Sequence, residues 1–196
     1  MLNVSTKQLI GVGVFLFAIF VGMPLIISAT GRWDFYFTLT SVALLSIASA
    51  GVWLTFYIGR INIGQGAFAL IGAYVSAILV VKSGWSFWIS LPAAGLFAAM
   101  VSIIIGIPIL RLRGVYFAMI TLVLTQVVTL TALALPITNG ARGMSSIPLP
   151  SGVSLLGIPI LPDFAGMENT KLAFYYTACI LMIVTYAALY RLVNSR

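Results

Sequence analysis

The sequence predicts an all-α fold: a polytopic membrane helix bundle with six transmembrane helices and one long outer loop rich in proline and glycine. Of the 196 residues, 62% are hydrophobic and only 7% are charged, which leaves too little polar surface for a water-soluble domain. Most of the chain lies in stretches without Asp, Glu, Lys or Arg. A helix needs about 20 apolar residues to cross a bilayer, and backbone groups in lipid must be satisfied internally. These stretches are therefore predicted to be membrane-spanning helices.

The first predicted span follows Lys7 and has to be distinguished from a signal peptide. Its apolar part is longer than the hydrophobic region of a signal peptide, and no convincing small-x-small cleavage site follows it. The first span is therefore expected to be retained, and the whole chain, residues 1–196, forms one predicted transmembrane domain. The six predicted spans cover residues 9–29, 36–58, 62–81, 87–110, 115–136 and 172–190.

The second and fourth spans are preceded by aromatic residues of the kind that gather at membrane–water interfaces. These residues are Trp33, Phe35, Tyr36 and Phe37, and then Trp85, Phe87 and Trp88. The third and fourth spans also carry small residues at intervals of four, which let helix backbones approach closely in lipid. The two stripes, Ala69, Ala73 and Ala77, and Ala94, Ala98, Ser102 and Gly106, are predicted to be packing faces.

The third span opens with the run GRINIGQGAF at residues 59–68. Two amides, Asn62 and Gln65, and three glycines are costly at the start of a membrane helix unless they face protein or water. One interpretation is a broken helix start whose backbone groups and amides are available to a ligand or to a neighbouring helix. The other is a helix cap with a close-packing glycine face. Both interpretations remain open at the level of sequence.

The fifth span carries a polar stripe in the middle of the membrane. Thr121, Thr125 and Thr129 recur at intervals of four, with Gln126 beside them. Threonines often donate back to helix carbonyls four residues earlier, and such a stripe then has no functional meaning. A stripe that includes glutamine is nonetheless the best candidate in this chain for a translocation path.

Residues 143–162 are uncharged, yet they are predicted to be a loop rather than a span. Four prolines and three glycines in this segment would break a helix repeatedly. The loop between Ile137 and Glu168 is about thirty residues long, and loops of that length are usually functional or disordered. Its aliphatic residues favour an ordered segment that packs on the outer membrane surface or on a partner.

The distribution of basic residues predicts the topology. With the N-terminus inside, the cytoplasmic side collects six bases, against four on the outer side, and cytoplasmic loops carry the excess of Lys and Arg. Both termini are therefore expected in the cytoplasm, and the formal charge of +7 is explained by lipid headgroups rather than nucleic acid. The six cytoplasmic bases are Lys7, Arg60, Arg111, Arg113, Arg191 and Arg196.

Residue types exclude several kinds of chemistry. The chain has no histidine, only three acidic residues and one cysteine, Cys179. General acid–base catalysis, intramembrane proton relays and a metal site all lack the groups they need, so the chain is not expected to be an enzyme or to hold a cofactor. A phosphate-binding G-x-x-x-x-G-K-[ST] loop is also absent from the sequence, so ATP hydrolysis would belong to another protein.

Three segments resemble signatures of the permease subunits of branched-chain amino-acid ABC importers. The first is the run at residues 59–68 with its continuation IGAY at 71–74, and the second is LRLRGVYFA at residues 110–118. The third, TNGARGM at residues 138–144, is similar to an outer-loop motif that usually reads Thr-Gly-Gly, with Asn139 in place of one glycine. The segments occur in the family's order, and the chain is more similar to LivM-like subunits than to their LivH-like partners.

The resemblance implies a subunit of the bacterial inner membrane that translocates branched-chain amino acids by alternating access. Its implied partners are a second permease subunit, two cytoplasmic ATPase subunits and a periplasmic amino-acid-binding protein, besides membrane lipid. The loop residues expected to face the binding protein are Thr138, Asn139, Gly140, Arg142 and Gly143. The residues expected on the ATPase side are Arg111, Arg113, Arg191 and Arg196, although Arg111 and Arg113 could instead anchor lipid headgroups.

The resemblance also implies that family members continue after residue 190 with a cytoplasmic docking loop and further spans. The chain is therefore expected to be the N-terminal portion of a longer family domain, either truncated or completed by a separate product. Four alternatives remain open: a permease for urea or short amides, an ATP-independent secondary transporter, an ATP-independent channel, and an inert fragment. The candidate path residues in any of the transporting cases are Asn62, Gln65, Thr121, Thr125, Gln126 and Thr129.

Overall fold

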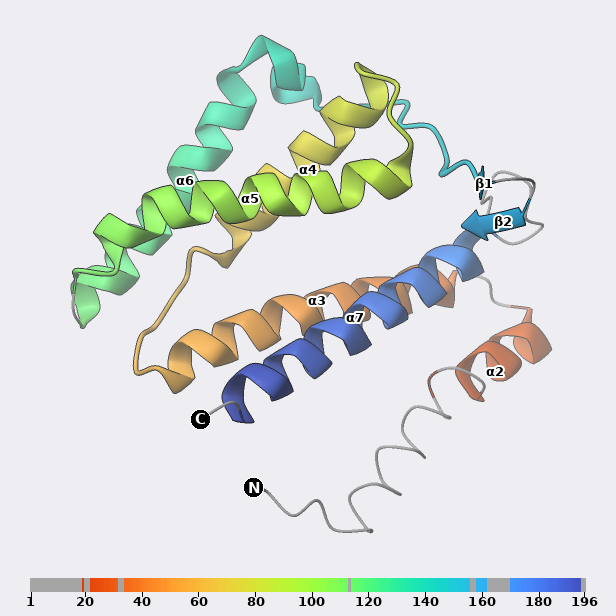
Figure 1. The fold of residues 1–196 in the computed structure, drawn as a ribbon, viewed down its shortest axis with the longest axis horizontal. Helices are drawn as coiled ribbons and strands as arrows, with labels where there is room; N and C mark the ends of the chain where they lie inside the picture. The colour runs from red at the N-terminus through yellow and green to blue at the C-terminus, as the bar shows by residue number, and fades with distance from the viewer. Residues whose placement is uncertain are drawn as a thin grey trace. The chain divides into compact units, whose positions relative to one another are not determined.

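The computed structural model describes residues 19, 22–31, 34–112, 114–155, 158–161 and 170–194 (Figure 1). Contacts divide the chain into two compact units. The first unit combines Met1–Ala50 with Met167–Arg196, and the second is Gly51–Gly166. Helix α3, Phe35–Tyr57, contributes its first part to one unit and its last turns to the other.

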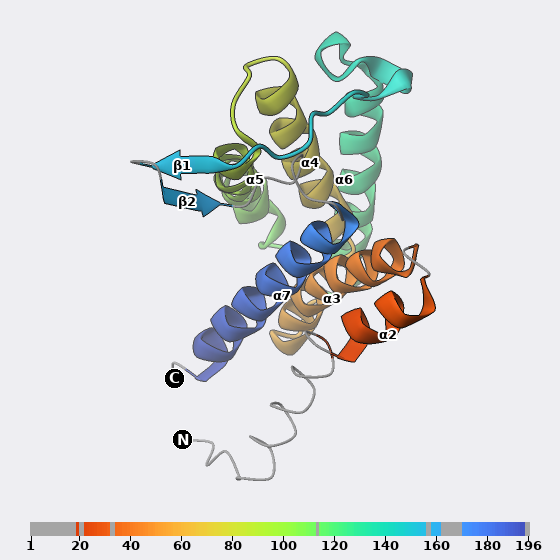
Figure 2. The ribbon, with the colours of Figure 1, turned by 90° about the vertical axis from the view of Figure 1, so that its right-hand side faces the viewer.

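The first unit contains α2, Met23–Thr30, the first part of α3, and α7, Thr170–Asn194. Helices α3 and α7 lie side by side and run in the same direction (Figures 1 and 2). The ion pair between Lys171 and Asp34, with 2.8 Å between Nζ and Oδ1, joins their first turns. Further along both helices, the hydroxyl oxygens of Ser46 and Tyr186 lie 3.0 Å apart. The core of this unit is formed by Ile27 of α2, Tyr36 of α3, and Tyr175 and Cys179 of α7.

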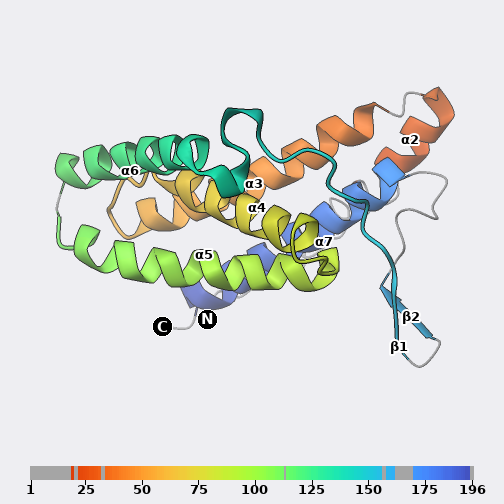
Figure 3. The same cartoon turned by 90° about the horizontal axis from the view of Figure 1, so that it is seen from above.

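The second unit is built around helix α4, Gln65–Val81. Helices α5, Phe87–Ile109, and α6, Val115–Ala134, flank α4 on its two sides (Figure 3). Helix α5 runs antiparallel to α4, and the hydroxyl oxygens of Ser76 and Ser90 lie 3.3 Å apart between them. Beside the predicted stripe of α4, a Cβ built on Gly72 would lie 3.8 Å from the Cβ of Ala98, a member of the predicted stripe of α5. Close backbone approach, as expected in lipid, brings α4 and α5 together.

The predicted spans agree closely with the observed helices, with one informative difference. Among the described residues, α3, α5, α6 and α7 are long and apolar enough to cross a membrane, so the protein is a multi-pass membrane protein. Helix α4 has 17 residues and begins at Gln65 rather than at residue 62, because residues 59–64 are not helical. Most of the predicted span 9–29 lies outside the described residues, where α2 covers only its end. Six spans therefore stay a prediction.

The predicted outer loop begins with two short 3-10 helices, η2 at Pro136–Thr138 and η3 at Gly140–Arg142. It also contains a hairpin of two antiparallel strands, β1 at Val153–Leu155 and β2 at Ile158–Leu161 (Figure 2). The all-α class is confirmed, and this short hairpin lies within the segment that was predicted to be a loop. Aliphatic residues favour strands, and proline prevents a helix, so the uncharged segment pairs with itself.

Candidate functional site

Residues 59–64, which we call the 59–64 loop, connect α3 to α4 without regular structure. Gly59 begins the loop with a φ of +79°, a left-handed conformation that glycine adopts without strain. Near the end of the loop, the Oδ1 atom of Asn62 accepts a hydrogen bond of 2.8 Å from the backbone N–H of Gly64. The asparagine side chain thus takes the place of a helix carbonyl, and α4 starts at the following residue.

The 59–64 loop docks on α6 through its backbone. The N–H of Ile63 donates to Oγ1 of Thr121 at 3.2 Å, and Oγ1 of Thr125 lies 3.4 Å from the Ile63 carbonyl, within reach to donate to it. Interrupted helices in a membrane require such partners for the backbone groups that they free. A Cβ on Gly64 would lie 3.2 Å from both the Cβ and the carbonyl oxygen of Thr121, so glycine permits the close approach.

Arg60 attaches the other end of the loop to the α5–α6 turn, which we define as residues 110–112 and 114. Its Nη1 atom donates to the carbonyls of Leu110 at 2.7 Å and Leu112 at 2.9 Å. Its guanidinium also lies 5.3 Å from the ring centroid of Phe117, which is buried. The two segments predicted as family signatures, residues 59–68 and 110–118, therefore meet in space.

A cavity of about 300 Å³ lies where these segments meet α5. Its polar lining consists of Thr55, Asn62, Ser102 and Thr121, and no charged side chain is found among the described residues that line it. The remaining lining is aliphatic or aromatic, as in many small-molecule sites, whose volumes start at roughly 300 Å³. The apolar lining residues are Phe68, Ile103, Gly106, Ile107, Ile109, Leu110, Phe117 and Leu124.

The structure separates the six predicted path residues. Asn62 and Thr121 line the cavity, whereas the amide of Gln65 packs against α3, where a Cβ on Gly51 would lie 3.0 Å from its Oε1. The other three lie on α6 away from this cavity: Thr125 and Thr129 can donate to the carbonyls four residues earlier, at 3.2 and 2.8 Å, and Gln126 is exposed. Helix back-bonding accounts for the hydroxyl of Thr129, whereas the hydroxyl of Thr125 lies within reach of both the Thr121 and the Ile63 carbonyls.

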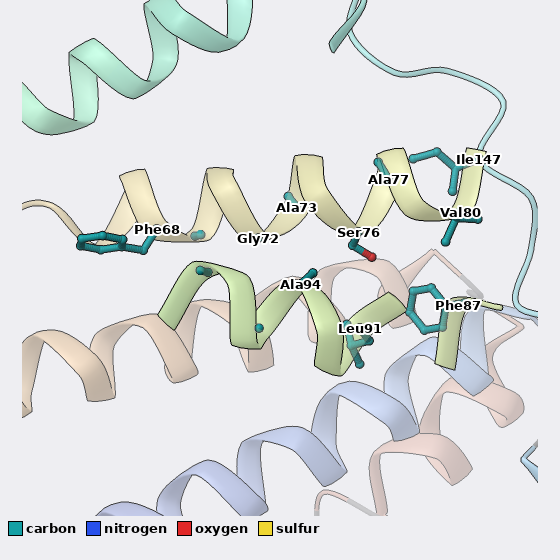
Figure 4. A pocket seen from close by; sticks show the side chains of 13 residues that line it. Phe68, Gly72, Ala73, Ser76, Ala77, Val80, Phe87, Leu91, Ala94 and Ile147 are labelled. Atoms are coloured by element: carbon teal, nitrogen blue, oxygen red, sulfur yellow. The ribbon is translucent and has the colours of Figure 1, made fainter. Parts of the chain in front are cut away.

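A second hollow, a groove of about 420 Å³, runs between α4 and α5 (Figure 4). Small residues of both stripes line it, among them Ala73, Ala77 and Ala94, and Ile147 lies beside Val80 at one end (Figure 4). Its one polar lining residue, Ser76, faces the hydroxyl of Ser90. The groove offers apolar packing space rather than groups that would orient a polar solute.

The outer-loop motif forms a compact cap at the C-terminal end of α6. The hydroxyl of Thr138 is in position to donate to the carbonyls of Leu135, at 2.7 Å, and of Ala132, two of the last carbonyls of the helix. Asn139 follows with a φ of +66°, and its Nδ2 donates to the Gly143 carbonyl at 3.1 Å. Asparagine tolerates the left-handed conformation better than most residues, which explains physically why it can stand where the motif has glycine.

The remaining predicted loop and ATPase-side residues have the following positions. Gly140 also has a positive φ, and a Cβ there would lie 3.2 Å from the Leu133 carbonyl. Arg142 is exposed at the end of η3. Arg111 is exposed in the α5–α6 turn, and Arg191 is exposed in the last turn of α7. Arg113 and Arg196 lie outside the described residues.

The comparison with protein families decides the assignment. The family described as "Branched-chain amino acid transport system / permease component" matches residues 35–196. The chain belongs to this family. The members of this family are permease components, that is, membrane subunits of transport systems.

Two curated permeases resemble the chain, each over 138 aligned residues. The High-affinity branched-chain amino acid transport system permease protein LivM of Escherichia coli (strain K12) is 36% identical, and that of Salmonella typhimurium (strain LT2) is 35% identical. Each alignment covers 64% of this chain and 32% of the relative, so the match spans about a third of the relatives' length. No solved structure matches the chain.

Sequence reasoning missed several residues that shape the cavity of this permease. Thr55 lies in a span and has no signal that separates it from other threonines in helices. Ser102 and Gly106 stand out in the sequence as members of a small-residue stripe, but they line the cavity as well. Arg60 carried a usable signal, because it is the only charged residue between Asp34 and Lys82 and sits directly before the glycine-rich run.

Proposed function

We propose that this chain is the permease subunit of an ATP-driven importer that translocates branched-chain amino acids across the bacterial inner membrane by alternating access. Membership of the permease family supports the role, and the names of the LivM relatives support the substrate class. Its partners in this proposal are a second permease subunit, two cytoplasmic ATPase subunits and a periplasmic binding protein. The energy source is the ATPase pair, since the chain itself contains no phosphate-binding loop.

The observation that carries the proposal is the chemistry of the cavity at the 59–64 loop. Its largely aliphatic lining suits a branched side chain, and Asn62 and Thr121 add polar groups at one place. The Oδ1 atom of Asn62 accepts the hydrogen bond from Gly64 N–H, and no hydrogen bond donated by its Nδ2 is found among the described residues. The Nδ2 group is therefore available to a carboxylate or carbonyl oxygen of a solute.

The proposed topology has six spans with the N-terminus and residue 196 in the cytoplasm. Helix α6 has 20 residues, which at ~1.5 Å per residue corresponds to about 30 Å, the thickness of a hydrocarbon core. The α5–α6 turn precedes this helix and the motif at residues 138–143 follows it. This arrangement supports assigning the turn to the ATPase side and the motif to the binding-protein side.

A permease for urea or short amides is the second candidate. In the part of the chain that the structure describes, the polar groups lining the cavity are one amide and three hydroxyls, and none of the lining side chains is charged. Such a lining suits an uncharged amide as well as it suits the polar end of an amino acid. Urea and short amides are too small to contact the aliphatic part of the lining in a cavity of about 300 Å³. The aliphatic lining therefore favours the amino acid.

Uptake by the assembled transporter tests the proposal. Proteoliposomes containing this chain, its partner subunits and the binding protein are loaded with ATP on the ATPase side and given labelled leucine or labelled urea. We expect leucine to accumulate, and a catalytically inactive ATPase to abolish accumulation. Leucine uptake that survives the inactive ATPase would indicate a secondary transporter or channel. Uptake that appears only after the C-terminal region of a relative is appended would identify the chain as an inert portion.

A further inference from the structure

Arg60 holds two parts of the second unit together that are fifty residues apart in the sequence. It belongs to the 59–64 loop, and its guanidinium lies on the α5–α6 turn, 2.7 Å from the Leu110 carbonyl and 2.9 Å from the Leu112 carbonyl. The sequence explains this charge only as a cytoplasmic arginine that obeys the positive-inside rule. The contacts give it a specific structural role instead.

The partners of Arg60 are groups that need a donor. Leu110 follows the last residue of α5, and the final carbonyls of a helix have no partner within it. A cation at that end also meets the negative end of the helix dipole. Both hydrogen bonds come from Nη1, whose two N–H groups serve the two carbonyls, and the guanidinium carbon lies over the ring of Phe117, 5.3 Å from the ring centroid. A lysine ammonium also donates to carbonyls, but it lacks the planar, delocalised cation that lies over the ring.

The 59–64 loop is therefore anchored at two points, with Asn62 between them. One anchor is Arg60 on the α5–α6 turn, and the other is the hydrogen bond from Ile63 N–H to Thr121 on α6. Asn62 lines the cavity, and in the sequence only Ile61 separates it from Arg60, while Ile63 follows it directly. A displacement of the turn is therefore transmitted to Asn62 as long as both anchors hold.

We propose that Arg60 is a positioning residue that couples the α5–α6 turn to Asn62, so that movement of the ATPase-facing turn changes the polar side of the cavity. The assignment of the turn to the ATPase side rests on the proposed function. The mechanical link between turn and loop does not rest on it, because its anchors are contacts within one compact unit.

Hydrogen–deuterium exchange tests the link without any transport assay. We use the full chain assembled with its partners in lipid nanodiscs and compare Arg60→Gln with Arg111→Gln, which removes the same charge from the turn itself. Loss of Arg60 should speed amide exchange about tenfold in peptides covering both the 59–64 loop and the turn, since both lose charge-assisted hydrogen bonds. The Arg111→Gln variant should leave exchange in the loop unchanged. Equal protection of the loop in Arg60→Gln and the natural chain would overturn the link.

The second anchor provides a matched comparison. Thr121→Val removes the acceptor for Ile63 N–H while leaving Arg60 in place. Exchange should then rise in the loop but not in the turn. Increases in both segments for Thr121→Val would mean that the whole unit loosens whichever contact is removed, and the specific role of Arg60 would be lost.

The coupling itself is tested by measuring ATP hydrolysis and leucine uptake on the same Arg60→Lys and Arg60→Gln samples. A positioning role predicts that hydrolysis stimulated by the binding protein is retained while uptake per ATP falls about tenfold, with Lys intermediate. A merely structural role predicts that both activities fall together with the amount of assembled complex, and that result would refute coupling. If the natural complex moves no leucine, the proposed function fails, and the exchange data still decide the link.

Discussion

The hydroxyl of Thr121 serves Ile63 and Ala118 at once: it accepts a hydrogen bond of 3.2 Å from the Ile63 N–H and donates one of 2.9 Å to the Ala118 carbonyl. It is one of the few polar side chains that are buried among the described residues. This arrangement ties the interrupted start of α4 to α6. Both hydrogen bonds of the hydroxyl are made within the protein, so its main role is structural, although Thr121 also lines the cavity.

Replacing Thr121 by valine should weaken the docking of the 59–64 loop on α6, because valine keeps the shape and removes the acceptor. The Ile63 N–H, whose hydrogen bond is partly buried, would then lose its partner, at a cost of about 1 kcal/mol. Thr121→Ser keeps the hydroxyl and is the matched control. Thermal unfolding of the detergent-solubilised complex measures both variants. Equal midpoints for Thr121→Val and Thr121→Ser would show that the hydrogen bond contributes nothing.

Gly64→Ala should weaken the docking of the 59–64 loop on α6. The added Cβ would lie 3.2 Å from the backbone carbonyl oxygen of Thr121, which cannot move aside as a flexible side chain could. Overpacking of this kind costs roughly 1–3 kcal/mol. Gly66→Ala is the control, since its Cβ would meet Thr125 Cγ2 at an ordinary 3.6 Å. Expression and thermal stability should fall for the first variant and not for the second.

Asn62→Ala should raise the KM for solute uptake, because the variant loses the one cavity amide that is free to donate. We expect KM to rise about tenfold, which corresponds to ~1.4 kcal/mol of binding free energy, a reasonable value for one polar contact. Gln126→Ala tests the competing path along the exposed face of α6, where Gln126 lies outside this cavity. A larger effect of Gln126→Ala than of Asn62→Ala would move the path to that face.

Asn139 should tolerate glycine and reject a β-branched residue. Its φ of +66° costs an ordinary L-residue about 1–2 kcal/mol, while glycine pays no steric cost. Asn139→Gly is therefore expected to match the natural chain in thermal stability despite the loss of the Nδ2 hydrogen bond to Gly143. Asn139→Val should unfold at a lower temperature. A stable Asn139→Val variant would mean that the cap at the end of α6 can rearrange freely.

The sequence contained most of the information about the helices. The lack of charge and the turn residues between stretches predicted α3, α5, α6 and α7 to within a few residues, because the requirement to cross lipid acts on every residue of a span. The exceptions are the start of α4 and the hairpin of β1 and β2. At both places glycine or proline interrupts the helix, and its free backbone N–H and C=O groups bond to partners that the neighbouring sequence does not specify.

The candidate site was predictable only in part. Asn62 and Thr121 were both selected as polar residues in spans, but Thr125 and Gln126 were selected by the same criterion and lie elsewhere. Periodicity identifies which residues share a helix face, and it does not identify what that face meets. Arg60 shows the converse, since a residue explained by topology alone turned out to bind the α5–α6 turn.

The sequence by itself determined that the chain crosses a membrane repeatedly and which family it resembles, because hydrophobic length and local motifs are properties of contiguous residues. Only the tertiary structure decided that the 59–64 loop docks on α6, since the hydrogen bond between Ile63 and Thr121 joins residues 58 positions apart. Which buried N–H meets which hydroxyl depends on the packing of α4 between α5 and α6. That packing minimises unsatisfied polar groups over the whole unit rather than along any one segment.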